Sequence, residues 1–220
     1  MNDEEQHHTK YTVSIPKDQF AAMPAESYNG RIVLVQDLFT ATKALRYLSD
    51  QPMVGFDTET RPAFKKGQTH GVALMQLSSA DCCFLFRISR LGLFPELKDF
   101  LENPTIVKIG LSTRDDFHVL NRISPVTPQG FIELQTLVKE YMISDISLTK
   151  IYAILFGSRI SKGQRLTNWE AVELTEAQQR YAALDAWACL RIYNHLISGR
   201  FIPTESPFYH PVTEPQSQEQ

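Results

Sequence analysis

The sequence Gly55-Phe56-Asp57-Thr58-Glu59 ends an apolar run that begins near Met53 and has the composition of a buried β-strand. Side chains two residues apart in a strand point to the same face, so Asp57 and Glu59 should project together. Two neighbouring buried carboxylates repel each other and lose hydration, and this cost must be offset. A divalent cation offsets it well, because such ions prefer hard oxygen ligands. The same residues also fit a strand that runs into a solvated acidic turn.

A second acidic segment lies downstream of this pair. Lys108-Ile109-Gly110-Leu111-Ser112 has the pattern of a short strand and turn, and a helix should follow it. With Thr113 as the expected N-cap, Asp116 takes the third position of that helix. An acid in a first helical turn is also stabilised by the helix macrodipole, so Asp116 by itself indicates little.

A third segment near the end of the sequence carries a tyrosine and another acid. Thr175-Glu176-Ala177-Gln178 has the spacing of a capping box and should open a long helix that runs to about Ile197. Tyr181 and Asp185 are four residues apart and therefore share one face of this helix, beside its apolar stripe. Taken singly, each is more typical of a helix surface than of a catalytic site.

Together these three segments resemble the motifs of the DEDD 3′→5′ exonucleases. The matching stretches are Phe56-Asp57-Thr58-Glu59, residues 108–120 with Asp116, and Tyr181-Ala182-Ala183-Leu184-Asp185-Ala186. The tyrosine four residues before the last aspartate is typical of the DEDDy branch, which includes ribonuclease D and the exonuclease domain of the Werner-syndrome protein. The similarity runs from about residue 30 to residue 198, in order and at the spacings of the family. It also includes residues 71–78, 168–169 and 174–178.

The resemblance implies an enzyme that hydrolyses phosphodiester bonds at nucleic-acid 3′ ends and releases nucleoside 5′-monophosphates. It implies two divalent metal ions, Mg²⁺ or Mn²⁺, which activate the attacking water and stabilise the departing oxygen. Asp57 would bridge both ions, and Asp116 would hold the second. The ion on the nucleophile side would be completed by Glu59 and Asp185. Tyr181, with an ordinary pKa of about 10, would orient the attacking water rather than act as a base.

Contacts to the substrate are predicted from two basic loops and one strand. The loop 61–70 holds cations and an aromatic residue, so it could follow a phosphate backbone, or it could be a solvated loop. A second basic loop precedes Asn168-Trp169, in a region that lies near the active-site cleft in the family, and Trp169 is expected to be a packing residue. The strand beside the catalytic strand contacts the terminal nucleotide in family members. The candidate substrate-binding residues are therefore Gln76, Leu77, Lys65, Lys66, Lys162 and Arg165.

The order of strand and helix patterns predicts an α/β fold, with a mixed sheet of five to six strands flanked by helices. A strand over 31–35 and a helix over 38–48 come first. Strands over 53–59, 72–78 and 82–87 have short connections and should form an antiparallel meander. Further strands and helices alternate after it, as in mixed sheets covered on both faces. The mainly helical segments expected there are 131–142, 146–155 and 175–197. The resemblance implies that this architecture is ribonuclease H-like.

The predicted exonuclease domain covers residues 30–202. Residues 1–29 contain scattered Pro and polar residues and should form an irregular arm. Residues 203–220 contain four prolines and several glutamines and should form a flexible tail. They leave no room for the helical RNA-binding domains that accompany ribonuclease D, so we expect a stand-alone catalytic domain whose tails could dock a protein partner.

The charge of the chain is unusual for a nucleic-acid enzyme. Its formal net charge is −3, with 25 acidic and 22 basic residues. Leaving out the six acidic residues and one basic residue of segments 1–10 and 203–220 leaves 19 acidic and 21 basic residues. Four of those acids belong to the predicted metal site, whose ions would neutralise them. We therefore expect a modestly basic domain with weak, salt-dependent affinity for nucleic acid.

Compartment and partners are predicted from what the sequence lacks. No apolar run is long enough to span a bilayer, and the first ten residues lack the layout of a secretory signal. Cys82, Cys83 and Cys189 lack the spacing of a zinc site and fit buried thiols of a reducing cytosol. We expect a cytoplasmic protein with no membrane partner. Single-stranded 3′ ends are the expected substrate, and DNA and RNA both remain open.

Three other functions fit parts of the sequence. A catalytically silent nucleic-acid-binding or scaffold module can use the same fold, although every catalytic position is present here. A phosphatase with an aspartyl nucleophile would use Asp57-Thr58-Glu59-Thr60, which is similar to the first motif of the haloacid-dehalogenase type. That reaction gives no role to Tyr181 and Asp185. The third is a nuclease that acts within a larger complex and uses its terminal segments as docking arms.

Overall fold

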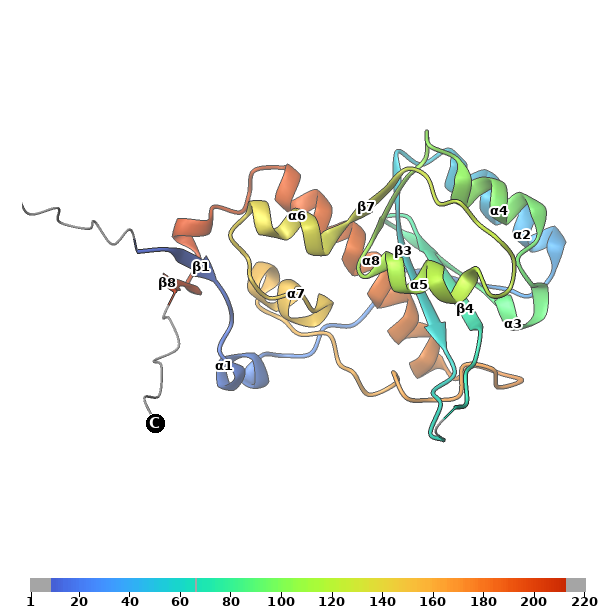
Figure 1. The fold of residues 1–220 in the computed structure, drawn as a ribbon, viewed down its shortest axis with the longest axis horizontal. Coiled ribbons are helices and arrows are strands. Elements are labelled where there is room, and N and C mark those ends of the chain that lie inside the picture. Colours follow the sequence, from blue (N-terminus) through green and yellow to red (C-terminus); the bar gives the residue numbers. More distant parts are fainter. Residues whose placement is uncertain (1–8, 66, 213–220) are drawn as a thin grey trace, which may run out of the picture.

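The computed structural model describes residues 9–65 and 67–212 and contains a six-stranded mixed sheet with helices on both faces (Figure 1). The strand order is β2-β5-β4-β3-β6-β7. The central strands β5, β4 and β3 pair antiparallel, while β2, β6 and β7 are added in parallel. The predicted mixed sheet and meander are therefore confirmed. The bounds are Arg31–Val35 for β2, Met53–Thr60 for β3, Val72–Ser78 for β4, Cys82–Phe86 for β5, Val107–Gly110 for β6 and Phe131–Glu133 for β7.

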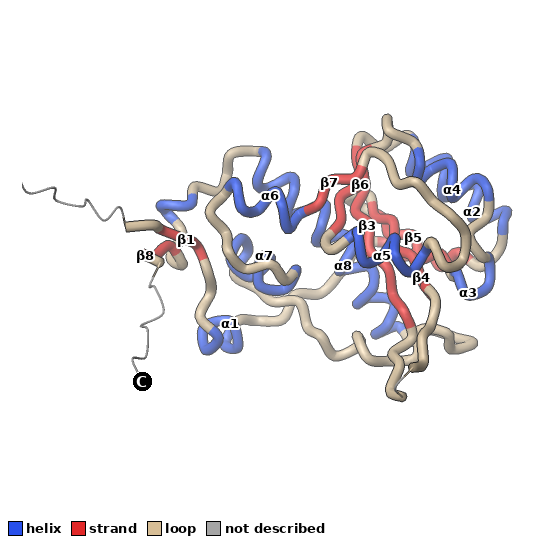
Figure 2. The backbone as a smooth tube through the Cα atoms, in the orientation of Figure 1, coloured by secondary structure: helices blue, strands red, loops and turns tan. Residues whose placement is uncertain are grey.

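Helices cover both faces of the sheet and bury two separate cores (Figure 2). Side chains of α6, α7 and α8 pack on one face, around Leu74 and Leu85. Side chains of α2, α4 and α5 pack on the other, around Phe56 and Leu77. The helices are Lys17–Ala22 (α1), Leu38–Ser49 (α2), Ile88–Leu91 (α3), Pro95–Glu102 (α4), Thr113–Leu120 (α5), Leu134–Glu140 (α6), Leu148–Phe156 (α7) and Glu176–Ile197 (α8). Because successive strand residues face opposite sides, β3 contributes to both cores.

A glycine lets α8 lie directly against β3. A Cβ atom on Gly55 would lie 1.9 Å from the main-chain oxygen of Ala186, far closer than two such atoms can approach. Glycine within a strand often marks such a close approach of backbones. The predicted capping box fixes the start of α8: Thr175 Oγ1 accepts from Gln178 N at 3.2 Å, and Gln178 Oε1 accepts from Thr175 N at 3.0 Å. Gly55 and this cap place α8 across the end of β3.

Two local predictions differ from the structure at helix starts. The segment 131–142 is mainly helical through α6, as predicted, but its helix does not begin at residue 131, because Phe131–Glu133 forms β7 and pairs in parallel with β6. The free edge of β6 supplies the backbone hydrogen bonds that make the extended form favourable there. Thr113 is not an N-cap either: Ser112 holds that position, so Asp116 is the fourth residue of α5.

The terminal segments are ordered in their described parts. Strand β1, Tyr11–Val13, pairs antiparallel with β8, Tyr209–Pro211, after a short 3-10 helix at Pro203–Glu205. The rings of Tyr11 and Tyr209 stack with their centroids 5.0 Å apart. The predicted irregular arm and flexible tail therefore do not hold for residues 9–29 and 203–212. Residues 1–8 and 213–220, which complete those predicted segments, lie outside the described residues.

None of the helices within residues 9–65 and 67–212 combines the length and apolar character of a membrane span. Cys82, Cys83 and Cys189 are free thiols buried in the two cores, as predicted.

Candidate active site

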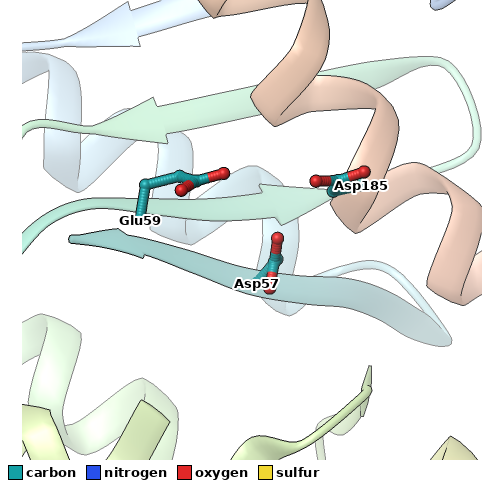
Figure 3. A group of neighbouring side chains, drawn as sticks. All are labelled: Asp57, Glu59 and Asp185. Carbon is teal, nitrogen blue, oxygen red and sulfur yellow. The ribbon is translucent and has the colours of Figure 1, made fainter. Parts of the chain in front are cut away.

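Three acidic side chains from two elements converge between β3 and α8 (Figure 3). Asp57 and Glu59 extend from the same face of β3, as the strand alternation predicts, and Asp185 comes from α8. One carboxylate oxygen from each lies within 4.8 Å of the others. The pairing of β3 with β4 shifts register between Glu59 and Thr60, an irregularity common next to active sites. This group can bind a cation with oxygen ligands alone.

Burial makes ionisation of these carboxylates costly. Burial, followed by repulsion from Asp57, raises the pKa of Glu59 to about 10. The pKa of Asp57 is raised well above its ordinary value by burial and by Asp185. Burial raises the pKa of Asp185 to about 7, against the opposing effects of Tyr181 and Lys162. A divalent cation would remove this penalty, so the donor set fits Mg²⁺ or Mn²⁺.

Asp116 lies beside this group rather than within it. It projects from the first turn of α5, and its Oδ1 accepts a hydrogen bond from Thr58 Oγ1 at 2.5 Å. Burial, and then the charge of Asp57, raise its pKa to about 8. The structure therefore brings the fourth predicted acid close enough to Asp57 for the two charges to interact.

Tyr181 lies one helical turn before Asp185. Burial, and then the charges of Asp185 and Glu59, raise the pKa of its hydroxyl above the ordinary value. The hydroxyl is therefore a hydrogen-bond donor at neutral pH and cannot act as a base. Its ring lies 6.1 Å from that of Trp169, which is fully buried and is the predicted packing residue.

A cleft of about 370 Å³ opens beside the acids. Asp57, Asp185 and Tyr181 line it, together with Lys162 and Arg165 from the loop that precedes α8. Further lining residues come from the turn before α5 and from the start of α7. The positive charge of Lys162 partly offsets the rise in the pKa of Asp185, and that of Arg165 partly offsets the rise in the pKa of Glu59. The cleft thus joins an acidic group that suits cations to a basic margin that suits phosphates.

Comparison with known proteins shows to which family the chain belongs. The model of a family described as 3′-5′ exonuclease matches residues 32–198. The chain belongs to the 3′-5′ exonuclease family. The mouse bifunctional 3′-5′ exonuclease/ATP-dependent helicase WRN is 38% identical over 155 residues, which are 68% of this chain and only 11% of that protein. The resemblance to the exonuclease domain of the Werner-syndrome protein is thereby confirmed.

Solved structures share the fold of this exonuclease family member. The Aedes aegypti Nibbler EXO domain superposes with a TM-score of 0.71 and 22% identity, over 82% of this chain and 97% of that chain. Escherichia coli RNase D superposes with a TM-score of 0.68 and 22% identity, over 76% of this chain and 44% of that chain. The predicted ribonuclease H-like architecture is therefore confirmed.

Several predicted substrate residues of this family member do not reach the cleft. Gln76 and Leu77 are fully buried and do not line the cleft, so their contact with a nucleotide stays a prediction. Both lie on β4, a central strand covered by helices on both faces. Gln76 lies opposite Asp57, and its side-chain amide has no hydrogen-bond partner among the described residues. Lys65 is exposed and does not line the cleft, and Lys66 lies outside the described residues.

The loop that carries Lys162 and Arg165 is held at its far end by interactions that the sequence patterns did not reveal. The guanidinium of the fully buried Arg87, after β5, donates to the main-chain oxygen of Ala171 at 2.5 Å. Arg61, directly after β3, forms an ion pair with Glu170 at 3.2 Å. The loop is therefore tied to the ends of two strands of the sheet, and one of these strands carries Asp57 and Glu59.

Proposed function

We propose that this chain is a metal-dependent 3′→5′ exonuclease that hydrolyses phosphodiester bonds at nucleic-acid 3′ ends and releases nucleoside 5′-monophosphates. The observation that carries the proposal is the convergence of Asp57, Glu59 and Asp185 beside Tyr181, in a chain of the 3′-5′ exonuclease family.

Two divalent ions, Mg²⁺ or Mn²⁺, would activate the attacking water and stabilise charge on the departing oxygen. Asp57, Glu59 and Asp185 would hold the ion on the nucleophile side. Asp57 and Asp116 would hold the other, because Asp116 lies next to Asp57 from the opposite element. Magnesium keeps several waters, so four carboxylates shared between two ions form a sufficient set of protein ligands.

The remaining side chains of the cleft bind and orient the substrate in this proposal. The protonated Tyr181 hydroxyl donates a hydrogen bond and holds the attacking water in line with the scissile phosphorus. Lys162 and Arg165 bind the phosphate oxygens on the open side of the cleft.

The test is degradation of 5′-labelled single-stranded DNA and RNA with Mg²⁺, Mn²⁺ or EDTA. We expect products that shorten from the 3′ end with either metal and no products in EDTA. Asp57→Ala should lower the rate by about 10³-fold or more, since several kcal/mol of charge stabilisation are lost. Tyr181→Phe should lower it by about 10²-fold, because the water loses its orienting donor.

Asp115→Asn is the matched control, because Asp115 is exposed and adjacent to Asp116. Its rate should stay within about twofold of the wild type. Absence of cleavage for both nucleic acids with both metals would contradict the proposal and favour a silent binding module. A covalent phosphoryl-enzyme would contradict it too, in favour of an aspartyl phosphatase.

The two cations of the cleft should act on substrate binding more than on chemistry. For the variant Lys162→Ser/Arg165→Ser we expect a KM raised by about tenfold or more and a kcat changed much less, because phosphate contacts bind ground state and transition state alike. The slope of log KM against log salt should fall by roughly one for each phosphate that the variant no longer neutralises. Lys98→Ser is the control. Lys98 lies on α4, on the other face of the sheet from the cleft, and its side chain pairs with Glu102. An unchanged salt slope in the double variant would place the phosphates elsewhere.

A further inference from the structure

We propose that Glu133 positions Asp116 for the second metal ion by capping the first turns of α5 and α6 together. The inference rests on the proposed function, since it takes Asp116 as a metal ligand. Glu133 is the last residue of β7, at the edge of the sheet, and immediately precedes α6. No motif marks it in the sequence.

The carboxylate of Glu133 accepts four hydrogen bonds. Its Oε1 accepts from the main-chain nitrogens of Ser112 at 2.9 Å and Gln135 at 3.1 Å. Its Oε2 accepts from the main-chain nitrogen of Thr113 at 2.8 Å and from Thr113 Oγ1 at 2.9 Å. A carboxylate has about four acceptor sites, so these donors occupy all of them and leave none for an ion. Glu133 therefore acts through the elements that it holds and not as a ligand.

The turn before α5 depends on this cap. Ser112 has a left-handed backbone, with φ of 60° and ψ of 30°, which is uncommon for a residue other than glycine. The Ser112 side chain makes no capping hydrogen bond of its own. The first amides of a helix have no partner within the helix, and a negative charge beside them is favourable. Glu133 supplies both the acceptor and the charge.

This cap determines where Asp116 lies. Thr113 and Asp116 are three residues apart and are neighbours on the helix surface, so a shift of the first turn moves the Asp116 carboxylate with it. Phe131, two residues before Glu133 and on the same face of β7, packs edge-on against Phe117 with ring centroids 4.9 Å apart. β7 therefore holds α5 on both sides of Asp116.

The short length of α5 makes these contacts decisive. α5 has eight residues, fewer than an isolated helix needs to be stable in water. Its orientation is therefore set by tertiary contacts. Thr58 donates to Asp116 itself, Phe117 packs on Phe131, and the Glu133 cap holds the first amides of the helix. Without this cap, those amides would need new acceptors, and the first turn would reorganise.

The test is binding of Mn²⁺ to Glu133→Gln, followed through the electron paramagnetic resonance signal of free Mn²⁺ well below the unfolding temperature. We expect the wild type to bind a tighter and a weaker ion. Glu133→Gln should retain the tighter ion and bind the weaker one at least about tenfold less well. Its nuclease rate should need correspondingly more Mn²⁺ and approach the wild-type rate at saturation. Glu133→Asp, which keeps the carboxylate, should recover part of the affinity.

Glu102→Gln is the control for a purely structural effect. Glu102 Oε1 accepts from the main-chain nitrogen of Thr127 at 2.8 Å, so this variant also loses a carboxylate that holds a main-chain amide, in the connection between α5 and β7 and away from the first turn of α5. It should bind both ions like the wild type. If Glu133→Gln unfolds, Thr113→Val removes one of the four hydrogen bonds and should show a smaller loss of the weaker ion.

The outcomes separate this inference from the proposed function. If the wild type binds two ions, Glu133→Gln loses affinity for one, and no nucleic acid is cleaved, the proposed function fails and the positioning role stands. If Glu133→Gln binds both ions as the wild type does, or weakens both equally, the positioning role is overturned. A wild type that binds a single ion overturns it as well.

Discussion

Replacing Glu59 by glutamine should make the metal-free protein more resistant to heat at pH 8 while greatly weakening its response to Mg²⁺ or Mn²⁺. Glu59 is 8% exposed and lies among three other carboxylates. Glutamine keeps its shape and removes the charge. We expect the unfolding temperature in EDTA to rise by roughly 5 °C, which corresponds to about 2 kcal/mol for a domain of this size. Differential scanning calorimetry with and without metal measures both effects.

The sign of this effect depends on pH. The pKa of Glu59 is raised from 4.5 to about 10, so between these values the folded state holds a proton that the unfolded state has lost. The free energy of unfolding of the metal-free protein should therefore fall as pH rises through this range. Asp116, with a pKa raised to about 8, and Asp185, raised to about 7, act in the same direction. The gain of Glu59→Gln should thus be small at pH 4.5 and grow toward pH 10.

The metal response should show the opposite trend. A divalent ion binds the deprotonated carboxylates, so its stabilisation of the wild type should increase with pH. Glu140→Gln is the control, since Glu140 is an exposed acid on α6 outside the site. A metal-free protein whose stability does not change between pH 5 and pH 9, or a Glu59→Gln variant that gains as much stability from Mn²⁺ as the wild type, would contradict this account of the acidic group.

The second large effect is expected for Gly55→Ala. The added Cβ would lie 1.9 Å from the main-chain oxygen of Ala186, where real Cβ atoms keep at least 3.0 Å, so α8 must move away from β3 by about 1 Å. Gly55 comes two residues before Asp57 and on the same face, and Ala186 follows Asp185. The displacement therefore increases the distance between the carboxylates of Asp57 and Asp185. We expect a loss of about 3 kcal/mol or more in the free energy of unfolding and a nuclease rate lower by at least about 10²-fold.

Urea unfolding and the nuclease assay check this expectation together. Gly71→Ala is the matched control. Gly71 directly precedes β4, and its added Cβ would meet only the side chain of Ile123, at an ordinary contact distance of 3.6 Å from Cδ1. This variant should be close to the wild type in both measurements. A Gly55→Ala protein with wild-type stability and activity would show that α8 does not rest on this glycine.

The acids and the start of α8 were predictable because short sequence patterns determine them. Alternation along β3 places Asp57 and Glu59 together, and the capping box at Thr175 fixes where α8 begins. Tyr181 and Asp185 then share a face through the helical repeat. The resemblance to known exonucleases predicts that these local patterns form one site.

Features that depend on partners distant in the sequence were not predictable in this way. Gly55 is essential only because Ala186 lies against it, more than a hundred residues later. Glu133 caps a helix that begins twenty residues before it. β7 is extended because β6 offers it a free edge, although its sequence also fits a helix. The burial of Gln76 and Leu77 follows from the central place of β4, which a pattern along one strand does not specify.

The pairing of β1 with β8 has a consequence for how this domain can be connected to other polypeptides. The main-chain nitrogen of Val212 donates to the oxygen of Lys10 at 2.7 Å, so the beginning and the end of the described chain meet at one point. That point lies beyond α6 and α7, at the opposite end of the molecule from α2 and α3 (Figure 1). A short peptide could link Lys10 to Val212 and allow circular permutation. Domains fused at both ends would emerge side by side, and deleting either terminal strand would leave the other without its partner.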